Sequence, residues 1–94
     1  MRSIEFTHLY LKDLRLARKR GLPEVELNVI VEKLAKDELL EPKHKDHPLK
    51  GNMKHFRECH IGGSGDWLLV YEKRKTDMIL YLVGTGTHVD LLGL

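Results

Sequence analysis

A chain of 94 residues with a formal net charge of +2 has room for one small domain, so we expect a single domain over residues 1–94. Its 41% hydrophobic and 32% charged residues exclude a wholly disordered chain. The apolar runs are too short to cross a bilayer and no leader pattern opens the sequence, so we expect a cytoplasmic protein without a membrane partner. Cys59 is the only cysteine, which excludes an intrachain disulfide and a cysteine zinc cluster.

The N-terminal half predicts a short strand at residues 3–6 followed by two helices. Thr7 is a suitable N-cap for the first helix and Gly21 a suitable terminator, while Pro23 fits the first turn of the second. Apolar side chains recur at helical spacing in both segments: Tyr10, Leu14 and Ala17, then Leu27, Ile30, Val31 and Leu34. The short turn between the segments predicts an antiparallel helical hairpin.

The C-terminal half predicts a sheet that follows a long connection at residues 37–55. Three alternating apolar segments cover residues 56–61, 67–72 and 78–83, separated by connections of hairpin length. Residues 88–94 would form a last short strand or an extended tail. The predicted fold class is therefore α+β, with a helical hairpin packed on one face of a small, mainly antiparallel β-sheet.

Positive charge is concentrated in two stretches, residues 12–20 and 43–57, each with five basic side chains and one acidic one. Clustered cations suit a polyanion such as RNA. The alternative is that these basic residues form a solvated surface and complement the helix dipoles. Composition alone favours this alternative.

Residues 46–88 contain four of the six histidines. In a strand at residues 56–61, Glu58 and His60 would share one face, while Arg57 and Cys59 would take the other. His47 and His88 would lie outside the strand centres, where loop side chains can converge on one cleft. We therefore expect a histidine-rich acid/base site.

Such a site fits the cleavage of RNA without a metal. The reaction needs a base for a 2′-hydroxyl, an acid for the leaving 5′-oxygen and cations for the phosphoryl oxygens. Imidazole can perform either proton transfer near neutral pH, and lysine or arginine can supply the charge. Trp67 could stack on an unpaired base.

Each of these residues also has an ordinary structural explanation. His47 could be a turn residue before Pro48, and Glu58 with His60 could be a surface pair. The others have equally plain readings: a packing role for Trp67, solvated loops for His44 and His55, and a small buried hydrophobe for Cys59.

A metal site is the weaker alternative. His44 and His47, or His60 with Asp66, offer nitrogen and oxygen ligands, but their spacing matches no standard zinc motif. We therefore expect neither a metal nor another cofactor.

Four motifs resemble, in this order, those of the YafQ-type toxins of the RelE superfamily. They are Asp46-His47-Pro48-Leu49-Lys50-Gly51, Phe56-Arg57-Glu58-Cys59-His60-Ile61, Asp66-Trp67-Leu68-Leu69-Val70-Tyr71 and Thr85-Gly86-Thr87-His88. The resemblance covers nearly the whole chain and implies a RelE-like fold. It further implies a type II toxin that enters the ribosomal A site and cuts mRNA, inhibited by a DinJ/RelB-like antitoxin. Operator DNA would be contacted only through that antitoxin.

The resemblance also implies which residues act. The catalytic set falls on His47, His60, Asp66 and His88, with Glu58 at the adjacent acidic position. Trp67 would position the mRNA. The resemblance does not assign the phosphate-binding cations of this chain, but three basic residues could hold the phosphates: Lys50, Lys54 and Arg57. His88 or His60 is the expected base, and the division of the remaining roles stays open.

Three positions depart from the family pattern. Gly84 stands where the family has an arginine, Leu92 replaces an aromatic residue, and the loop between His60 and Asp66 is two residues longer. These departures favour an alternative function, a catalytically weakened RelE-fold module that acts mainly in antitoxin binding and operon autoregulation. A gyrase-directed relative of the same fold needs no histidine cluster and ranks lower.

Overall fold

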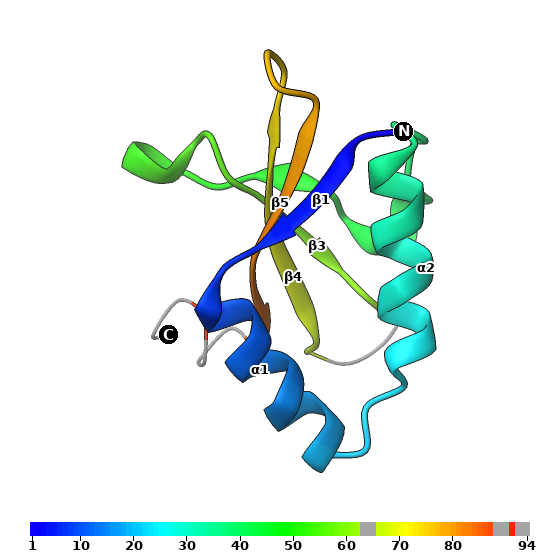
Figure 1. Ribbon diagram of the computed structural model, residues 1–94. Helices are drawn as coiled ribbons and strands as arrows, with labels where there is room; N and C mark the ends of the chain where they lie inside the picture. The colour runs from blue at the N-terminus through cyan, green and yellow to red at the C-terminus, as the bar shows by residue number, and fades with distance from the viewer. Residues whose placement is uncertain (63–65, 88–90, 92–94) are drawn as a thin grey trace.

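The computed structural model describes residues 1–62, 66–87 and 91. In chain order the elements are β1 (Ser3–Phe6), α1 (His8–Lys19), α2 (Glu24–Ala35), the 3-10 turn η1 (Pro42–His44), β2 (His47–Pro48), the 3-10 turn η2 (Gly51–Met53), β3 (Arg57–His60), β4 (Leu68–Arg74) and β5 (Ile79–Gly86), as Figure 1 shows. The predicted α+β class is confirmed. None of the helices within these described ranges is long and apolar enough to span a membrane.

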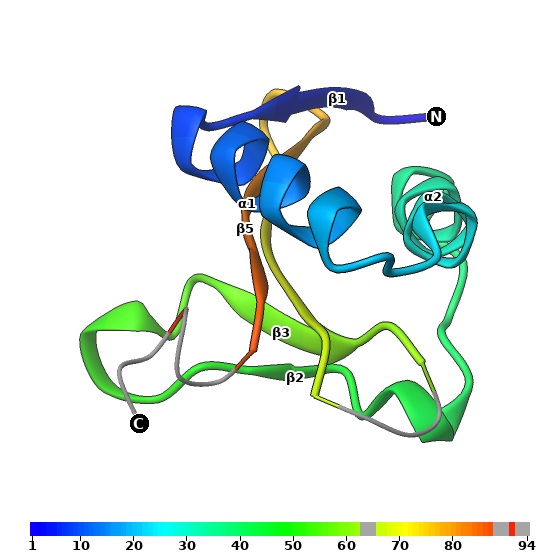
Figure 2. The same cartoon turned by 90° about the horizontal axis from the view of Figure 1, so that it is seen from below.

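The five strands form one sheet in the order β1-β5-β4-β3-β2. β1 pairs with β5 in parallel and every other pair is antiparallel, so the mainly antiparallel sheet is confirmed. β1 and β2 lie at opposite edges of the sheet (Figure 2). The sequence did not predict β2, which lies inside the expected long connection. Residues 88–90 and 92–94, expected to form a last strand or tail, lie outside the described part of the chain.

Both helices begin and end close to where the sequence predicts. The Thr7 hydroxyl accepts a hydrogen bond from the Tyr10 backbone N–H at 3.0 Å, which caps α1. Gly21, with φ of 73°, makes the left-handed turn after it. Arg18 then binds Glu24 through two hydrogen bonds of 2.7 and 2.9 Å, which joins the end of α1 to the start of α2.

The helices cover one face of the sheet. Buried residues of α1 and α2 pack with Cys59, Leu69, Tyr71, Leu80 and Leu82 in a single core cluster. Leu68 and Val70 alternate with Leu69 along β4; they are also buried, but they lie outside that cluster. β3 and β4 therefore have a helix-covered face and a second face, and the second face is the one relevant to the site.

Candidate functional site

His47, Glu58 and His60 lie together on the face of the sheet that the helices do not cover. His47 is the direct partner of Glu58 in the ladder between β2 and β3. Its Nε2 lies 3.7 Å from Glu58 Oε1. Glu58 and His60 are two residues apart on β3, and Cys59 between them faces the core. Two imidazoles and a carboxylate are thus placed on one surface.

The carboxylate of Glu58 is buried, with only 3% of the residue exposed, whereas the side chain of His47 is half-exposed. The explanation of Glu58 as part of a solvated surface pair is therefore wrong. A buried carboxylate has little water to screen its charge, so it acts strongly on a nearby cation. The pair can stabilise a positive charge on His47 at a moment when that ring accepts a proton.

His44 is also buried, which corrects its interpretation as a solvated loop histidine. Only 6% of the residue is exposed, and its Nδ1–H donates to the backbone carbonyl of His60 at 2.7 Å. The reason is tertiary: η1 docks on the end of β3, a contact that local polarity does not reveal. His55 is exposed as predicted, and the centroid of its ring lies 4.1 Å from the centroid of the Phe56 ring.

Asp46 anchors the segment that carries His47. One oxygen, Oδ1, accepts hydrogen bonds from the Tyr71 hydroxyl at 2.6 Å and from Arg57 Nε at 3.1 Å. Burial and this hydrogen bond raise the pKa of Tyr71 well above its ordinary value, so the phenol remains a donor. Sequence reasoning did not identify Asp46 or Tyr71, although Asp46 stands directly before His47.

The same contacts separate Arg57 from the other candidate substrate-binding residues. Its side chain binds Asp46, and its position on β3 alternates with Glu58 and His60, so it points away from their face. We therefore give Arg57 a structural role. Lys50 and Lys54 are exposed on either side of the turn η2, where they remain available to an anionic ligand.

Asp66 and Trp67 lie at the end of the sheet where His60 ends β3. The backbone N–H of Ile61 donates to the Trp67 carbonyl at 2.9 Å, which fixes the two segments side by side. Asp66 is exposed, but only 8% of Trp67 is, because the indole packs in the core. The ordinary explanation of Trp67 as a packing residue is confirmed.

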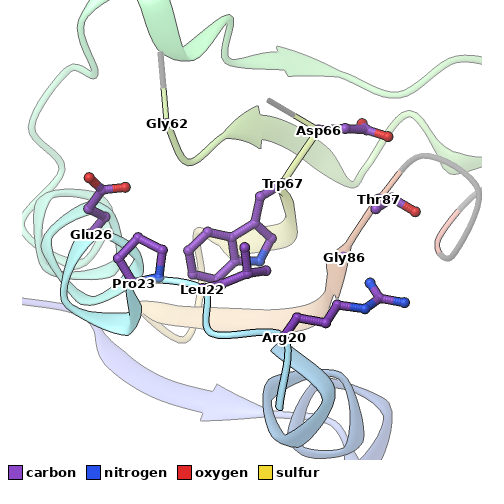
Figure 3. Close-up of a pocket in the computed structure, with 9 residues that line it drawn as sticks. All are labelled: Arg20, Leu22, Pro23, Glu26, Gly62, Asp66, Trp67, Gly86 and Thr87. Atoms are coloured by element: carbon purple, nitrogen blue, oxygen red, sulfur yellow. The ribbon is translucent and has the colours of Figure 1, made fainter. Parts of the chain in front are cut away.

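A cavity of about 320 Å³ adjoins this tryptophan. It lies between the turn that joins the two helices and the ends of the central strands (Figure 3). The lining residues are Arg20, Leu22, Pro23, Glu26, Gly62, Asp66, Trp67, Gly86 and Thr87. Sequence reasoning identified only Asp66 and Trp67 among them as candidate site residues. The others come from the turn between the helices and the start of α2, from Gly62 after β3, and from the end of β5.

His88 lies outside the described residues, but the strand that leads to it is placed. Gly86 pairs with Leu68, which pairs with His60, so Gly86 and His60 occupy one row across three strands. Thr87 follows directly. Within residues 1–62, 66–87 and 91, no three His, Cys, Asp or Glu side chains are grouped so that they could hold a metal.

Gly84, where the resemblance implies an arginine, has little space around it. A Cβ atom here would lie 3.1 Å from Asp13 Oδ2 and 3.1 Å from a methyl carbon of Leu91. Asp13 Oδ2 also accepts a hydrogen bond from the Thr85 backbone N–H at 3.1 Å. A carboxylate thus occupies the surroundings of the expected cation.

Comparison with known proteins agrees with this architecture over nearly its full length. Residues 2–93 match the family described as "Bacterial toxin of type II toxin-antitoxin system, YafQ". The mRNA interferase toxin YafQ of Escherichia coli K12 is 39% identical over 93 residues, which are 98% of this chain and 97% of that protein.

Solved structures give the same result. A metal-bound toxin from Helicobacter pylori is 43% identical and superposes with a TM-score of 0.90, over 98% of this chain and 100% of that one. A chain of the E. coli DinJ-YafQ complex is 34% identical, with a TM-score of 0.87 over 99% and 100% of the two chains. The chain belongs to the YafQ family of bacterial toxins of type II toxin-antitoxin systems.

Proposed function

We propose that this toxin cuts mRNA on the ribosome by acid/base catalysis with histidines. The observation that carries the proposal is the placement of His47, Glu58 and His60 on the face of the sheet that the helices do not cover. The relatives named mRNA interferase support the choice of substrate. His88 completes the proposed set through its place in the sequence, two residues after Gly86.

In this mechanism one imidazole removes the proton of a 2′-hydroxyl, and the resulting oxygen attacks the adjacent phosphorus. A second imidazole protonates the 5′-oxygen as its bond to phosphorus breaks. The products are a 2′,3′-cyclic phosphate and a 5′-hydroxyl. His60 or His88 is the proposed base, and Glu58 and Asp66 stabilise the charge that forms on the rings.

Exposed cations would hold the RNA. Lys50 and Lys54 flank η2, and α1 presents Lys12, Arg15 and Lys19 at helical spacing along one exposed side. The three α1 residues border a hollow of about 300 Å³. Because phosphate contacts release counterions, binding to the ribosome and to mRNA should weaken steeply as salt is raised.

The proposed protein partner is a DinJ-like antitoxin. The DinJ-YafQ complexes of the relatives support this assignment. The antitoxin would place a segment that folds on binding across the sheet face that carries His47 and His60. The toxin would reach operator DNA only through the antitoxin. We place the toxin in the cytoplasm, where mRNA and ribosomes are found.

The proposal is tested by inducing His47→Ala, His60→Ala and His88→Ala variants without antitoxin. Loss of one proton-transfer group should slow mRNA cleavage by ~10²–10⁴-fold and relieve growth arrest, while antitoxin binding persists. His55→Ala is the matched control, because His55 is an exposed histidine next to β3. If growth arrest and mRNA cleavage persist unchanged in all three variants, catalysis by these histidines is excluded.

A weakened module that acts mainly in antitoxin binding and autoregulation is the second candidate. The surroundings of Gly84 favour it, because Asp13 and Leu91 occupy the space that an arginine there would need. Expression of the toxin without antitoxin distinguishes the nuclease from the weakened module. A weakened module would bind antitoxin yet leave growth and mRNA intact when it is expressed alone.

A further inference from the structure

A slot of about 110 Å³ lies on the face of the sheet that the helices do not cover, and the acid/base mechanism does not use it. The described residues that line it contribute six apolar side chains and one glycine. Val70 of β4 is buried there, whereas Leu9 of α1 and Met53 of η2 are about half exposed. The slot therefore has an apolar lining and opens to solvent.

The slot and the proposed proton-transfer groups share one row of the sheet. His47 pairs with Glu58 on β3, which pairs with Val70 on β4. Val70 pairs in turn with Gly84 on β5, and both residues line the slot. Because neighbouring strands lie about 4.8 Å apart, Gly84 is about 10 Å from Glu58 along this row. A ligand in the slot is thus a close neighbour of the histidine and the carboxylate.

The backbone of β5 shapes the slot. The register between β4 and β5 shifts after Val70, so Val83 is an extra residue on β5, and both Val83 and Gly84 line the slot. A Cβ atom at Gly84 would lie 3.1 Å from a methyl carbon of Leu91 and 3.7 Å from one of Leu9, which also line it. A side chain at this position would press on the lining, so the shape of the slot depends on glycine.

The size and lining of the slot favour an aliphatic side chain. A cavity of about 150 Å³ can hold one benzene ring. A slot of about 110 Å³ therefore suits a smaller group, such as the side chain of leucine, isoleucine or valine. The described lining side chains offer no strong hydrogen-bond donor or acceptor, so a nucleobase would lose hydrogen bonds to water there without replacement. The chemistry favours a protein ligand over RNA.

Two exposed lysines flank the slot. Lys50 directly follows Leu49, and Lys54 directly follows Met53. Each lining residue from this part of the chain therefore has a cation next to it. Acidic side chains on either side of an inserted aliphatic residue would pair with these lysines, and charge pairs at the rim of an interface speed association and fix the register.

We propose that the slot anchors the antitoxin by holding one aliphatic side chain that has acidic neighbours in the antitoxin sequence. Since the slot lies about 10 Å from Glu58, about three residues of an extended segment reach from the anchor to the proton-transfer groups. The segment then covers His47 and closes the site to mRNA. This inference rests on the proposed antitoxin partner and names the contact that holds it.

The test is the rate at which the cognate antitoxin dissociates from the immobilised toxin, because changes in affinity appear mainly in that rate. Val83→Phe fills the slot. Ile79→Phe is the matched control, since Ile79 is also half-buried on β5 but lies outside the lining. Loss of one buried aliphatic contact should speed dissociation about 10- to 100-fold in Val83→Phe only. Equal rates for the two variants overturn the slot.

Met53→Gln tests the edge of the slot without depending on whether Val83→Phe folds. Glutamine has a similar length but a polar end, and Met53 is exposed. Dissociation should be about 3- to 10-fold faster, because part of the apolar contact is lost. Met78→Gln, at a similarly exposed methionine outside the lining, should have no effect. Equal rates for Met53→Gln and Met78→Gln contradict the proposal.

Alanine substitutions in the antitoxin identify the anchor from the other side. One aliphatic residue with acidic neighbours should lose about 10- to 100-fold in affinity for the original toxin when it becomes alanine. The same substitution should cost little against Val83→Phe, because the contact is already absent there. If every such substitution costs the same against both toxins, no antitoxin side chain occupies the slot.

Cleavage of mRNA separates the slot from the other proposals. Val83→Phe should still cut mRNA, at antitoxin concentrations that silence Ile79→Phe. Slower cleavage without faster antitoxin dissociation would assign the slot to the substrate, and a dimer of free toxin that only Val83→Phe disrupts would assign it to a second copy; either result overturns the proposal. Absence of antitoxin binding by any form removes the partner and the slot together. The predicted dissociation rates in a toxin that cuts no mRNA would remove the nuclease alone.

Discussion

The buried carboxylate of Glu58 faces the half-exposed ring of His47 across β2 and β3, with 3.7 Å between Oε1 and Nε2. In the proposed mechanism this carboxylate stabilises the imidazolium that forms during proton transfer. Glu58→Gln retains the shape of the side chain but removes its charge. We expect cleavage to fall on the order of 10- to 100-fold, which corresponds to the loss of about 1.4–2.7 kcal/mol of charge stabilisation in the transition state.

The rate of ribosome-dependent cleavage under single-turnover conditions measures this effect. Glu38→Gln, at an exposed position after α2, is the matched control for loss of one negative charge. RNA binding should be unchanged or tighter in Glu58→Gln, because the variant carries one negative charge fewer. Full cleavage activity in Glu58→Gln would show that the carboxylate has no part in the proton transfers.

The extent to which sequence predicted this arrangement depends on how local each signal is. Alternation along β3 is a period-two pattern within one segment, so it predicted the shared face of Glu58 and His60. β2 has only two residues, one of them Pro48, and forms against β3 as its template. No local sequence pattern predicts a strand of this length. Because the prediction did not include β2, it could not include the pairing of His47 with Glu58 either.

Long-range contacts account for the other differences. His44 lies 16 residues before the carbonyl that it binds, and Asp46 and Tyr71 are 25 residues apart. Propensity and periodicity describe neighbours along the chain and contain no information on these pairs. Asp46 and Tyr71 stand in two of the motifs that carry the resemblance, but nothing in those motifs assigned them a role or a mutual hydrogen bond.

His44 should hold the end of β3 in place through its hydrogen bond to the His60 carbonyl. His44→Phe keeps a ring in the buried site but leaves that carbonyl without this donor. We expect a loss of about 1–3 kcal/mol in the free energy of unfolding, measured by urea denaturation. His55→Phe, at an exposed position, should be nearly neutral. Equal stability of the two variants would contradict a structural role for His44.

The contact between Asp46 and Tyr71 should position the segment that carries His47. Tyr71→Phe removes only the hydroxyl that donates to Asp46 at 2.6 Å. The expected cost is about 1.5–3 kcal/mol in unfolding free energy, since the acceptor is charged. Cleavage should show a lower kcat at unchanged KM, because Lys50 and Lys54 are not altered. Tyr81→Phe serves as the control, and an equal effect there would rule out this specific contact.

Gly84 should tolerate no side chain without movement of its neighbours. Gly84→Ala brings a Cβ to 3.1 Å from Asp13 Oδ2 and from Leu91. We expect overpacking to cost about 1–3 kcal/mol, measured by urea denaturation. In a double-mutant cycle with Asp13→Ala, the two costs should be non-additive by at least about 0.5 kcal/mol. Additive costs would show that the strain does not arise between position 84 and Asp13. A Gly84→Ala variant as stable as the original protein would show that this position has room for a side chain.

Cys59 should be inert in the native protein and should make stability fall at alkaline pH. Burial raises the pKa of its thiol to about 12, so the native protein keeps a proton that the unfolded chain releases above pH ~8.5. The unfolded state is therefore favoured as pH rises from that value toward 12. Through this group, the free energy of unfolding at pH 9.5 should be about 1 kcal/mol lower than at pH 7.5. Urea denaturation at pH 7.5 and 9.5 measures the difference, which Cys59→Ala should lack. Rapid alkylation of the native thiol at pH 8, or an equal loss in both proteins, would show that solvent reaches Cys59.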